Sequence, residues 1–300
     1  MSQPPICDYE GSAYRTEFWV RERAYEDGAE RVALRALLPP TGRRLIEVGA
    51  GYGRLADLYA GYTEVVLLDY ARSQLQQARE RLGEAGRGGQ PRFVYVLGDF
   101  YHLPFVPGLF DTVVMVRVLH HAADAPAVLR GLADLLAPGG ALVLEFASKH
   151  HLKAILRYLA RRQPWSPFSH EPVEFVELNF DFHPAWVRQQ LTAAGLRVER
   201  TRTVSHFRLG LLKRTLPTGL LVALDRLCQP TGALWQLTPS VFLRARAPAE
   251  RPAAPADAFF RCPACGSTML AHEVSRLACT HCGAGFSIED GMVDFRLGER

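Results

Sequence analysis

The sequence predicts an α/β protein: a parallel sheet covered by helices on both faces, followed by a small separate module. Short runs of β-branched residues alternate with helical patterns along the first half of the chain. A turn with three glycines at alternate positions follows the first of these runs. Near the C-terminus, a stretch rich in proline and alanine precedes two pairs of cysteines. The 300 residues suffice for one large domain and one small one.

The alternation of patterns indicates where the secondary structure lies. Helix 125–137 is the clearest, with Asp124 as its N-cap, Pro126 in its first turn and Pro138 after its end. Strands that alternate with helices pair in parallel. The expected strands are 45–49, 65–69, 92–98, 110–119, 141–147, 196–204 and 240–246, and the other expected helices are 53–61, 72–84 and 184–194.

Composition also suggests the domain boundaries and the compartment. Residues 247–258 are rich in Pro and Ala, as linkers are, so we expect one domain over 1–246 and a module over 259–300. The N-terminus shows no basic-then-apolar leader, and no apolar run of about 18 or more residues lacks charges. We therefore expect a cytoplasmic protein, in which cysteines indicate metal or thiols before disulfides. A net charge of +4 is too small to indicate nucleic-acid binding.

Residues 45–56, LIEVGAGYGRLA, predict a strand, a sharp turn and the start of a helix. Glycines in such a turn let a ligand approach where a Cβ would clash, and helix N–H groups can face an anion. Gly49, Gly51 and Gly53 are two residues apart, which differs from the dinucleotide fingerprint. A nucleotide-like cofactor is one interpretation, and a purely structural turn is the other.

Two acidic residues follow the next two strands. Asp69 ends an apolar strand twenty residues after Gly49, and could accept hydrogen bonds from both ribose hydroxyls of a nucleoside. Asp99 follows the third strand, where it could bind an adenine amine while Phe100 packs near the ring. Each acid alone could equally be a helix cap or turn residue. The glycine turn, both acids and the strand ending in Leu-His-His occur together and in order.

This combination resembles class I S-adenosylmethionine (SAM)-dependent methyltransferases, most similar to the group that includes quinone-biosynthesis and other small-molecule enzymes. The resemblance is close over 45–147 and looser over about 240 residues. It implies a Rossmann-like sheet of seven strands, mostly parallel, with the last strand antiparallel, and substrate-covering inserts within 149–240. It implies SAM as cofactor, contacted by these residues: Glu47, Gly49, Ala50, Gly51, Gly53, Asp69, Tyr70, Asp99, Phe100 and the backbone around Arg117.

A general base is expected at the end of the fourth strand. Methyl transfer needs alignment of nucleophile and methyl above all, and a base assists when the nucleophile is a hydroxyl or an acidic carbon. His121 is the candidate base, whereas His120 is the candidate for a packed structural histidine. The chain lacks an Asp/Asn-Pro-Pro-Tyr/Phe motif after this strand and a Pro-Cys nucleophile, which disfavours methylation of nucleic-acid bases.

The C-terminal module carries two Cys-x-x-Cys pairs separated by 13 residues. Cys262, Cys265, Cys279 and Cys282 can close a tetrahedral Zn²⁺ site. His272 and His281 could substitute as ligands but are not needed. A module this small needs the metal for its folding free energy.

Residues 260–296 also resemble the small zinc-ribbon proteins that activate tRNA and protein methyltransferases as partner subunits. Here such a module is fused to the enzyme. Zinc ribbons also bind nucleic acid, but residues 257–300 contain four Arg and six Asp or Glu, so this use is less expected. We interpret the module as a structural or a docking and activating unit.

The substrate side is expected after the fifth strand. In 149–162, Lys149, Lys153, Arg157 and Arg161 are four apart and would share one helix face, opposite a row of leucines and Ile155. Trp165 and Phe168 follow. Residues 149–168 are therefore a candidate for contact with an anionic substrate or a membrane surface. The alternative is a solvated helix over an ordinary core.

These observations predict a SAM-dependent methyltransferase that acts on a small or lipid-like acceptor. One alternative is a methyltransferase for RNA or a translation protein, with the ribbon as recognition or activating module. A third hypothesis is a catalytically silent adaptor with a SAM-binding fold. The acceptor atom and the oligomeric state do not follow from the sequence.

Overall fold

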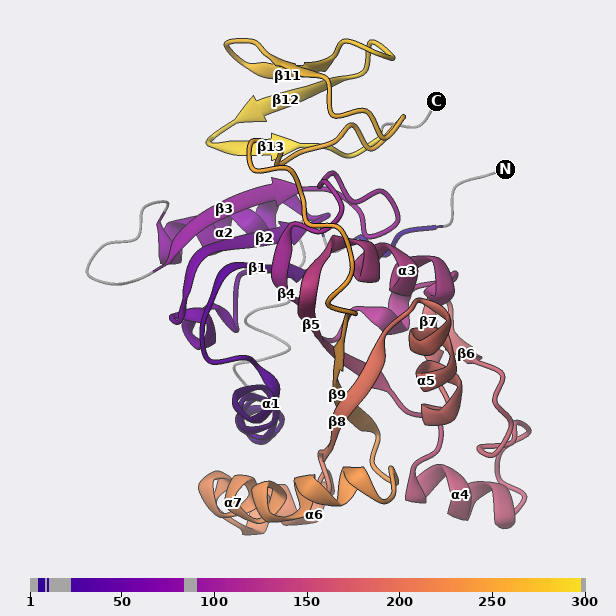
Figure 1. The fold of residues 1–300 in the computed structure, drawn as a ribbon. Coiled ribbons are helices and arrows are strands. Elements are labelled where there is room, and N and C mark those ends of the chain that lie inside the picture. The colour runs from indigo at the N-terminus through magenta and orange to yellow at the C-terminus, as the bar shows by residue number, and fades with distance from the viewer. Residues whose placement is uncertain (1–4, 9, 11–22, 84–90, 298–300) are drawn as a thin grey trace.

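The computed structural model describes residues 5–8, 10, 23–83 and 91–297, which form one extended twisted sheet with helices on both sides (Figure 1). Among these residues the sheet has eleven strands, in the order β10-β11-β12-β13-β3-β2-β1-β4-β5-β9-β8. The expected seven-stranded sheet is thus longer, because the four strands of the C-terminal module continue it beyond β3.

The central strands are parallel to one another, as the sequence predicts. β1 (Gly42–Val48) pairs in parallel with β2 (Tyr62–Asp69) on one side and with β4 (Phe110–Met115) on the other. β3 (Arg92–Leu97) extends the sheet beyond β2, and β5 (Leu136–Ala147) extends it beyond β4. β9 (Ser240–Arg246) is antiparallel to both of its neighbours, β5 and the edge strand β8 (Arg197–Val204).

Two hydrophobic cores hold helices against the two faces of the sheet. Ile46 and Val48 of β1 pack into the core that includes α3 (Ala125–Leu135) and α5 (Pro184–Ala193). Leu45 points to the other core, which includes α1 (Ala24–Leu37), α2 (Arg72–Leu82) and α7 (Thr218–Cys228). Figure 1 shows α1 and α2 on one side of the sheet and α3 and α5 on the other.

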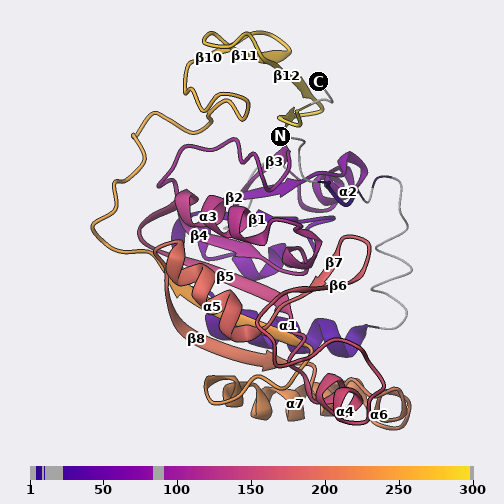
Figure 2. The ribbon, with the colours of Figure 1, turned by 90° about the vertical axis from the view of Figure 1, so that its right-hand side faces the viewer.

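Three further helices and a hairpin lie outside these layers. α4 (Leu152–Leu159) and α6 (Gly210–Thr215) lie with α7 at one end of the molecule, and η4 (Gln229–Ala233) follows α7 (Figures 1 and 2). β6 (Val173–Val176) and β7 (Asn179–Asp181) form a separate antiparallel hairpin. In the described parts of the chain no helix combines the length and the apolar character needed to cross a bilayer.

The segment between β9 and β10 runs along one side of the molecule to the far end of the sheet (Figure 2). It is attached on the way: Ala254 N donates to Gly108 O at 3.1 Å, and Arg251 forms an ion pair with Asp134. The residues 247–258, expected as a linker, thus contain no helix or strand but contact the body of the protein.

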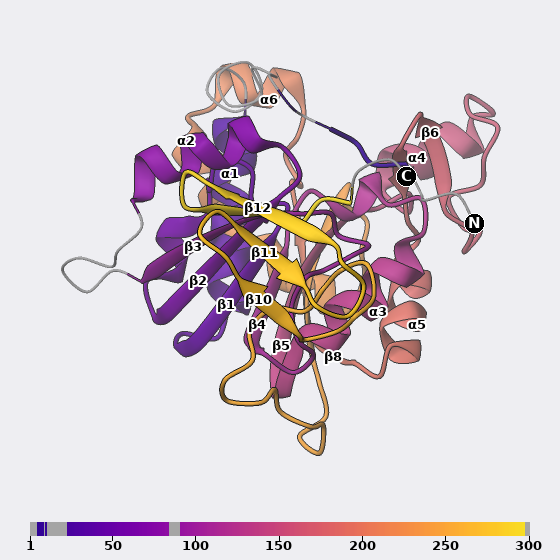
Figure 3. The same ribbon diagram turned by 90° about the horizontal axis from the view of Figure 1, so that it is seen from above.

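The C-terminal module consists of β10 (Leu270–His272), β11 (Arg276–Cys279), β12 (Gly285–Glu289) and β13 (Met292–Asp294). Successive strands of the module are antiparallel, but β13 pairs in parallel with β3. Seen from above, the module covers the β3 end of the sheet (Figure 3). Phe295 is almost fully buried at this junction, against Phe260 and Phe286.

Several expected elements differ from the structure. The expected helix at 53–61 is only a 3₁₀ turn, η2 (Ala56–Tyr59), because positive φ at Gly53 prevents an α-helix from starting there. The expected strand 110–119 ends at Met115, because Arg117 has a φ of 59° and the chain turns into η3 (Leu119–His121). The residues that follow α3 are extended rather than helical, because Leu136 pairs with Phe110. Residue 84, expected in the second helix, lies outside the described residues.

Candidate active site

The glycine turn forms the floor of a hollow at the carboxyl end of β1. Gly49, Gly51 and Gly53 all have positive φ, between 53° and 76°. A Cβ at Gly49 would lie 2.2 Å from Val118, whereas a Cβ at Gly51 would meet no atom within 4 Å. Gly49 therefore allows two loops to touch, and Gly51 leaves open space for a ligand above it.

The loop after β2 is held against this turn. The Asp69 carboxylate accepts hydrogen bonds from the backbone N–H groups of Gly51, at 2.7 Å, and of Ala71, at 3.0 Å. Burial raises the pKa of Asp69, and these backbone donors oppose the shift. The carboxylate thus sits at a fixed place on the wall of the hollow.

The hollow brings together most of the residues that the sequence singled out. Eight of the ten predicted cofactor contacts line its two parts, which share Gly49, Gly51 and Arg117: six line the first part, and Glu47 and Ala50 line the second. The first part, of about 630 Å³ open to solvent, is lined by Ile6, Cys7, Gly49, Gly51, Leu68, Asp69, Tyr70, Gln74, Gly98, Phe100, Arg117, Val118 and His121. The second, of about 330 Å³, is lined by Glu47, Gly49, Ala50, Gly51, Tyr52, Arg54, Leu55, Val116 and Arg117.

Two predicted contacts do not line the hollow. Gly53 lies beneath it, where a Cβ would approach Leu82 at 3.0 Å. Asp99 is buried, and its carboxylate accepts hydrogen bonds from the backbone N–H groups of Tyr101 and His102 at 2.6 and 2.8 Å. Asp99 therefore shapes the loop that carries Phe100 into the hollow.

Glu47 is a buried carboxyl group at the inner end of the hollow. Within the described residues its Oε2 atom has no hydrogen-bond partner. Burial raises the pKa of Glu47 to about 8, against smaller opposing effects of the Tyr59 hydroxyl and of Arg54. A buried carboxyl oxygen that lacks a partner fits a cationic donor from a ligand, such as the amino group of an amino acid.

Two arginines close the same end of the hollow by ion pairs with α1. Glu30 is fully buried and accepts from Arg117 Nε at 2.7 Å and from Arg54 at 2.8 Å. Burial alone would raise the pKa of Glu30, but the two guanidinium groups outweigh it and lower that pKa. The Arg117 backbone N–H also donates to Glu145 at 2.9 Å. These contacts hold Arg117 in its left-handed conformation.

His121 lies on the wall of the hollow, on the short helix η3. Its Nδ1 atom is 2.9 Å from the carbonyl oxygen of Leu178, so Nδ1 carries the proton and donates. Nε2 is then the basic nitrogen. Burial lowers the pKa of His121, which keeps the ring neutral at pH 7. Burial lowers the pKa of His120 to about 3, so its ring is neutral as well.

Sequence reasoning did not find several residues of the hollow. Ile6 and Cys7 come from the N-terminal segment, far from the motifs. Gln74 projects from the first turn of α2. The only feature of the sequence that could have indicated its place in the hollow is its position five residues after Asp69. Glu30 was missed because α1 has no capping signal: Arg23 makes no side-chain cap bond.

The expected basic helix is shorter than predicted. α4 spans Leu152–Leu159, so Lys149 precedes it. Lys149 is fully buried and donates to Ser169 Oγ at 2.9 Å and to Glu171 O at 2.7 Å. It therefore does not share a face with Lys153 and Arg157, because it lies outside the helical repeat.

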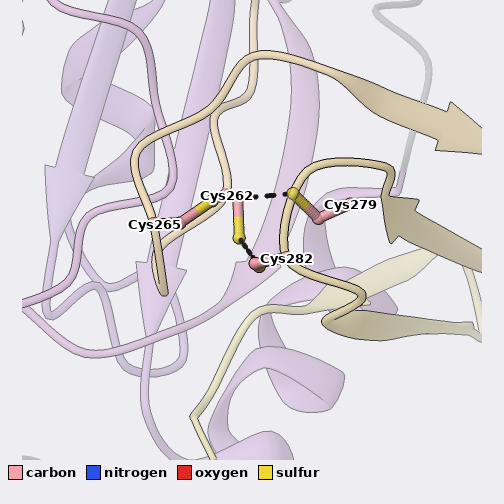
Figure 4. Close-up of side chains that lie close together, drawn as sticks. All are labelled: Cys262, Cys265, Cys279 and Cys282. Carbon is pink, nitrogen blue, oxygen red and sulfur yellow. Dashed lines mark hydrogen bonds between the residues drawn. The ribbon is translucent and has the colours of Figure 1, made fainter.

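The four cysteines of the module converge, as Figure 4 shows. Their sulfur atoms all lie within 4.8 Å of one another, and the two closest pairs, Cys262–Cys282 and Cys265–Cys279, are 3.7 and 3.6 Å apart. A disulfide would need about 2.05 Å. A tetrahedron with bonds of about 2.3 Å has edges of about 3.8 Å, so the thiols have the spacing of a metal site. Among the described residues the cluster includes neither His272 nor His281.

The module reaches the wall of the hollow through its last strand. Asp294 of β13 accepts from Arg72 at 3.1 Å, next to the Asp69 loop. Arg296 donates to the carbonyl oxygen of Tyr70 at 3.1 Å, and its guanidinium lies 5.4 Å from the centre of the Tyr70 ring. Phe295 N donates to Leu97 O at 2.8 Å. The strand and the two residues after it thus support the chain that follows β2 and the end of β3.

Comparison with known proteins decides what this hollow belongs to. Residues 46–144, which contain the glycine turn, Asp69, Phe100 and His121, match the family described as "Methyltransferase domain". The segment 46–144 thus has the sequence of a methyltransferase domain. The fold agrees: a SAM-dependent methyltransferase from Mesorhizobium loti aligns with a TM-score of 0.52 at 20% identity, over 73% of this chain and 97% of that chain.

Curated relatives of this segment are named as methyltransferases, several of them of quinone biosynthesis. The methyltransferase GfsG of Streptomyces halstedii is 31% identical over 125 residues, which are 41% of this chain and 42% of the relative. The ubiquinone/menaquinone biosynthesis C-methyltransferase UbiE of Cellvibrio japonicus is 33% identical over 116 residues, 37% and 46% of the two chains. The chain thus spans less than half the length of these two relatives.

Two further matches are longer. The demethylmenaquinone methyltransferase of Clavibacter sepedonicus is 29% identical over 210 residues, 66% of this chain and 78% of the relative. A chain of the solved complex that contains the Haloferax volcanii Trm112 methyltransferase activator aligns with a TM-score of 0.50 at 17% identity, covering 75% of this chain and 91% of that chain. This last similarity concerns the fold alone.

The first two glycines of the turn, Gly49 and Gly51, should respond differently to alanine. Gly49→Ala puts a Cβ 2.2 Å from Val118 at a residue with positive φ. The left-handed backbone alone costs a residue with a Cβ about 1–2 kcal/mol. Because the clash adds to this cost, the free energy of unfolding should fall by more than that amount. Gly51→Ala carries the strain without a clash, so it should lower stability less but weaken SAM binding. Urea denaturation and calorimetry measure both. Equal loss of stability in the two variants would contradict this account.

Affinity for SAM should depend on pH through Glu47. Because the pKa of Glu47 is about 8, its carboxyl group is protonated at lower pH. A cationic ligand group that binds the carboxylate must then displace this proton. The affinity should therefore rise with pH up to about 8, by at most about tenfold per pH unit. Glu47→Gln should weaken binding and remove most of this slope. Calorimetry in buffers of different ionisation enthalpy also counts the released proton, and a slope that persists in the Gln variant would exclude Glu47.

Proposed function

We propose that the chain transfers the methyl group of SAM to a small or lipid-like acceptor with an acidic O–H or C–H group. The observation that supports this most is the hollow itself, in which the glycine turn, Asp69, Glu47 and His121 surround one space within the methyltransferase domain. The names of the quinone-biosynthesis relatives support an acceptor of this class.

The residues fit SAM from one end of the hollow to the other. Glu47 would accept from the amino group of the methionine part, and Asp69 would accept from the ribose hydroxyls. Phe100 would pack beside the adenine ring. SAM, when bound, supplies a methyl group on a positively charged sulfur. The protein aligns the acceptor with that methyl and excludes water, which is the main requirement of such a displacement.

His121, which lines the hollow, would take the acceptor's proton. The Leu178 carbonyl fixes the ring with Nδ1 protonated, so Nε2 can accept a proton while the imidazole becomes cationic. Burial disfavours the cation, so the proton should then pass on to solvent or product. Positioned bases of this kind contribute about 10²–10⁴-fold to the rate.

The first experiment is transfer of labelled methyl from SAM into fractionated small molecules, lipids, RNA and protein. We expect label in the small-molecule or lipid fraction. His121→Ala should lower kcat by about 10²-fold or more with SAM affinity unchanged, and the exposed His170→Ala is the matched control. Unchanged turnover in His121→Ala removes the base assignment. Label in RNA or protein alone would favour the recognition alternative, and SAM binding without transfer to any fraction would favour the adaptor.

We further propose that the four cysteines hold Zn²⁺ and that the module braces the SAM site in cis. Zinc would fix the two turns that carry the thiols, because the module has little core of its own. The brace is β13 with the two residues after it: Asp294 contacts Arg72, Phe295 contacts Leu97, and Arg296 contacts Tyr70. The domain limits 1–246 and 259–300 remain part of this proposal.

The brace predicts that one arginine of the module affects cofactor binding. Arg296→Ala removes the bond to the Tyr70 carbonyl, so SAM affinity should fall by about three- to tenfold, the equivalent of one hydrogen bond. Arg276→Ala is the matched control, because Arg276 pairs with Glu273 on the exposed side of the module. Zinc content and the unfolding midpoint should change little in either variant. Equal SAM affinity in both variants would falsify the brace.

A further inference from the structure

An exposed apolar surface lies at the end of the molecule formed by α4, α6 and α7. On α4, Leu152, Leu156 and Leu159 share one helix face and are 55 to 67% exposed. Leu211 of α6 and Leu227 of α7 are 74 and 75% exposed. The same surface, hereafter the helical end face, also includes Leu209, Leu220, Leu234 and Trp235, all 46% or more exposed.

The members of the helical end face are brought together by the fold. Figures 1 and 2 show α4, α6 and α7 at one end of the molecule, opposite the zinc module. Leu152 N donates to Leu237 O at 2.9 Å, which joins the start of α4 to the segment after η4. The face therefore combines two stretches, 150–162 and 208–235, that are far apart in the sequence.

The exposed charges that these two stretches themselves carry have one sign. In 150–162 and 208–235 the only acidic residue is Asp225, and it is fully buried. The exposed charged side chains of these stretches are all basic: Lys153, Arg157, Arg161, Arg162, Arg208, Arg214 and Arg226. Leucines alternate with these cations along α4, which is the pattern of a helix that lies in a membrane interface.

We infer that the helical end face binds the surface of an anionic lipid bilayer, with the leucines and Trp235 in the interface and the basic residues at the headgroups. A second copy of the chain fits less well, because two such faces would bring like charges together. RNA fits less well, because bases stack on aromatic and guanidinium planes and gain little from exposed leucines. This inference rests on the proposed function, since it names where a lipid-like acceptor is taken up.

The face is connected to the active site through α1. Lys213 of α6 donates to Glu26 at 2.9 Å, and Glu30, one turn further along α1, holds Arg54 and Arg117 at the hollow. A bilayer that contacts α6 therefore lies one helix away from the cofactor site. An apolar acceptor dissolved in that bilayer would be within reach of the protein without release into water.

The test is co-sedimentation of the zinc-loaded full chain with vesicles of phosphatidylcholine, alone or mixed with phosphatidylglycerol. We expect binding to the anionic vesicles that weakens with salt. Lys153→Glu with Arg157→Glu should lower the partition coefficient by about tenfold or more, and Leu156→Ser with Leu211→Ser should do so at unchanged charge. The matched controls are Arg130→Glu on α3 and Val274→Ser in the module, both exposed and away from the face.

The outcomes separate this inference from the proposed function. SAM affinity, measured in solution for each variant, should equal that of the unaltered chain, which shows that the variants fold. No binding to anionic vesicles, or binding that both double variants retain, overturns the inference. So does a dimer in ultracentrifugation that dissociates in the leucine variant, or RNA binding that is lost in the charge variant. Each of these results leaves methyl transfer to a small acceptor standing.

Discussion

The site depends on the position of β1 between β2 and β4. The chain leaves β1 toward β2, whereas the chain that leaves β4 turns the other way into η3, so the two loops diverge at the carboxyl end of the sheet. Such a divergence is where open α/β sheets bind ligands. Gly49 sets how close the loops come, because only a residue without a Cβ allows Val118 to pack there.

The hollow is braced from two sides by elements outside the matched domain. On one side Glu30 of α1 holds Arg117, whose left-handed backbone costs of order 1–3 kcal/mol and persists only because the surroundings fix it. Removing Glu30 would take a fully buried carboxylate away from the guanidinium groups of Arg54 and Arg117. On the other side β13 continues the sheet beyond β3, and Arg296 after it donates to the Tyr70 carbonyl. The cofactor loops thus connect an N-terminal helix with a C-terminal strand.

Much of the site could be predicted because its signals are local. Each of its main features can be recognised within a few residues of sequence: the glycine turn, the acidic residue at a strand end and the Cys-x-x-Cys pairs. The structure places Asp69 and His121 on the wall of the hollow and brings the four thiols together. Asp99 shows the limit of such signals. A carboxylate at a strand end can bind a ligand, but it can equally accept hydrogen bonds from the backbone of the following turn, as Asp99 does.

The sequence by itself determined that the central strands are parallel, that a glycine turn follows the first of them and that four cysteines can cluster, because spacing along the chain specifies each of these features. Only the tertiary structure decided that β13 pairs with β3, that Glu30 reaches Arg117 and that α4, α6 and α7 lie at one end of the molecule. These contacts join residues far apart in the chain. No local period or motif encodes them. They form because the folded sheet leaves an edge and faces exposed, and distant segments of the chain pack against these surfaces.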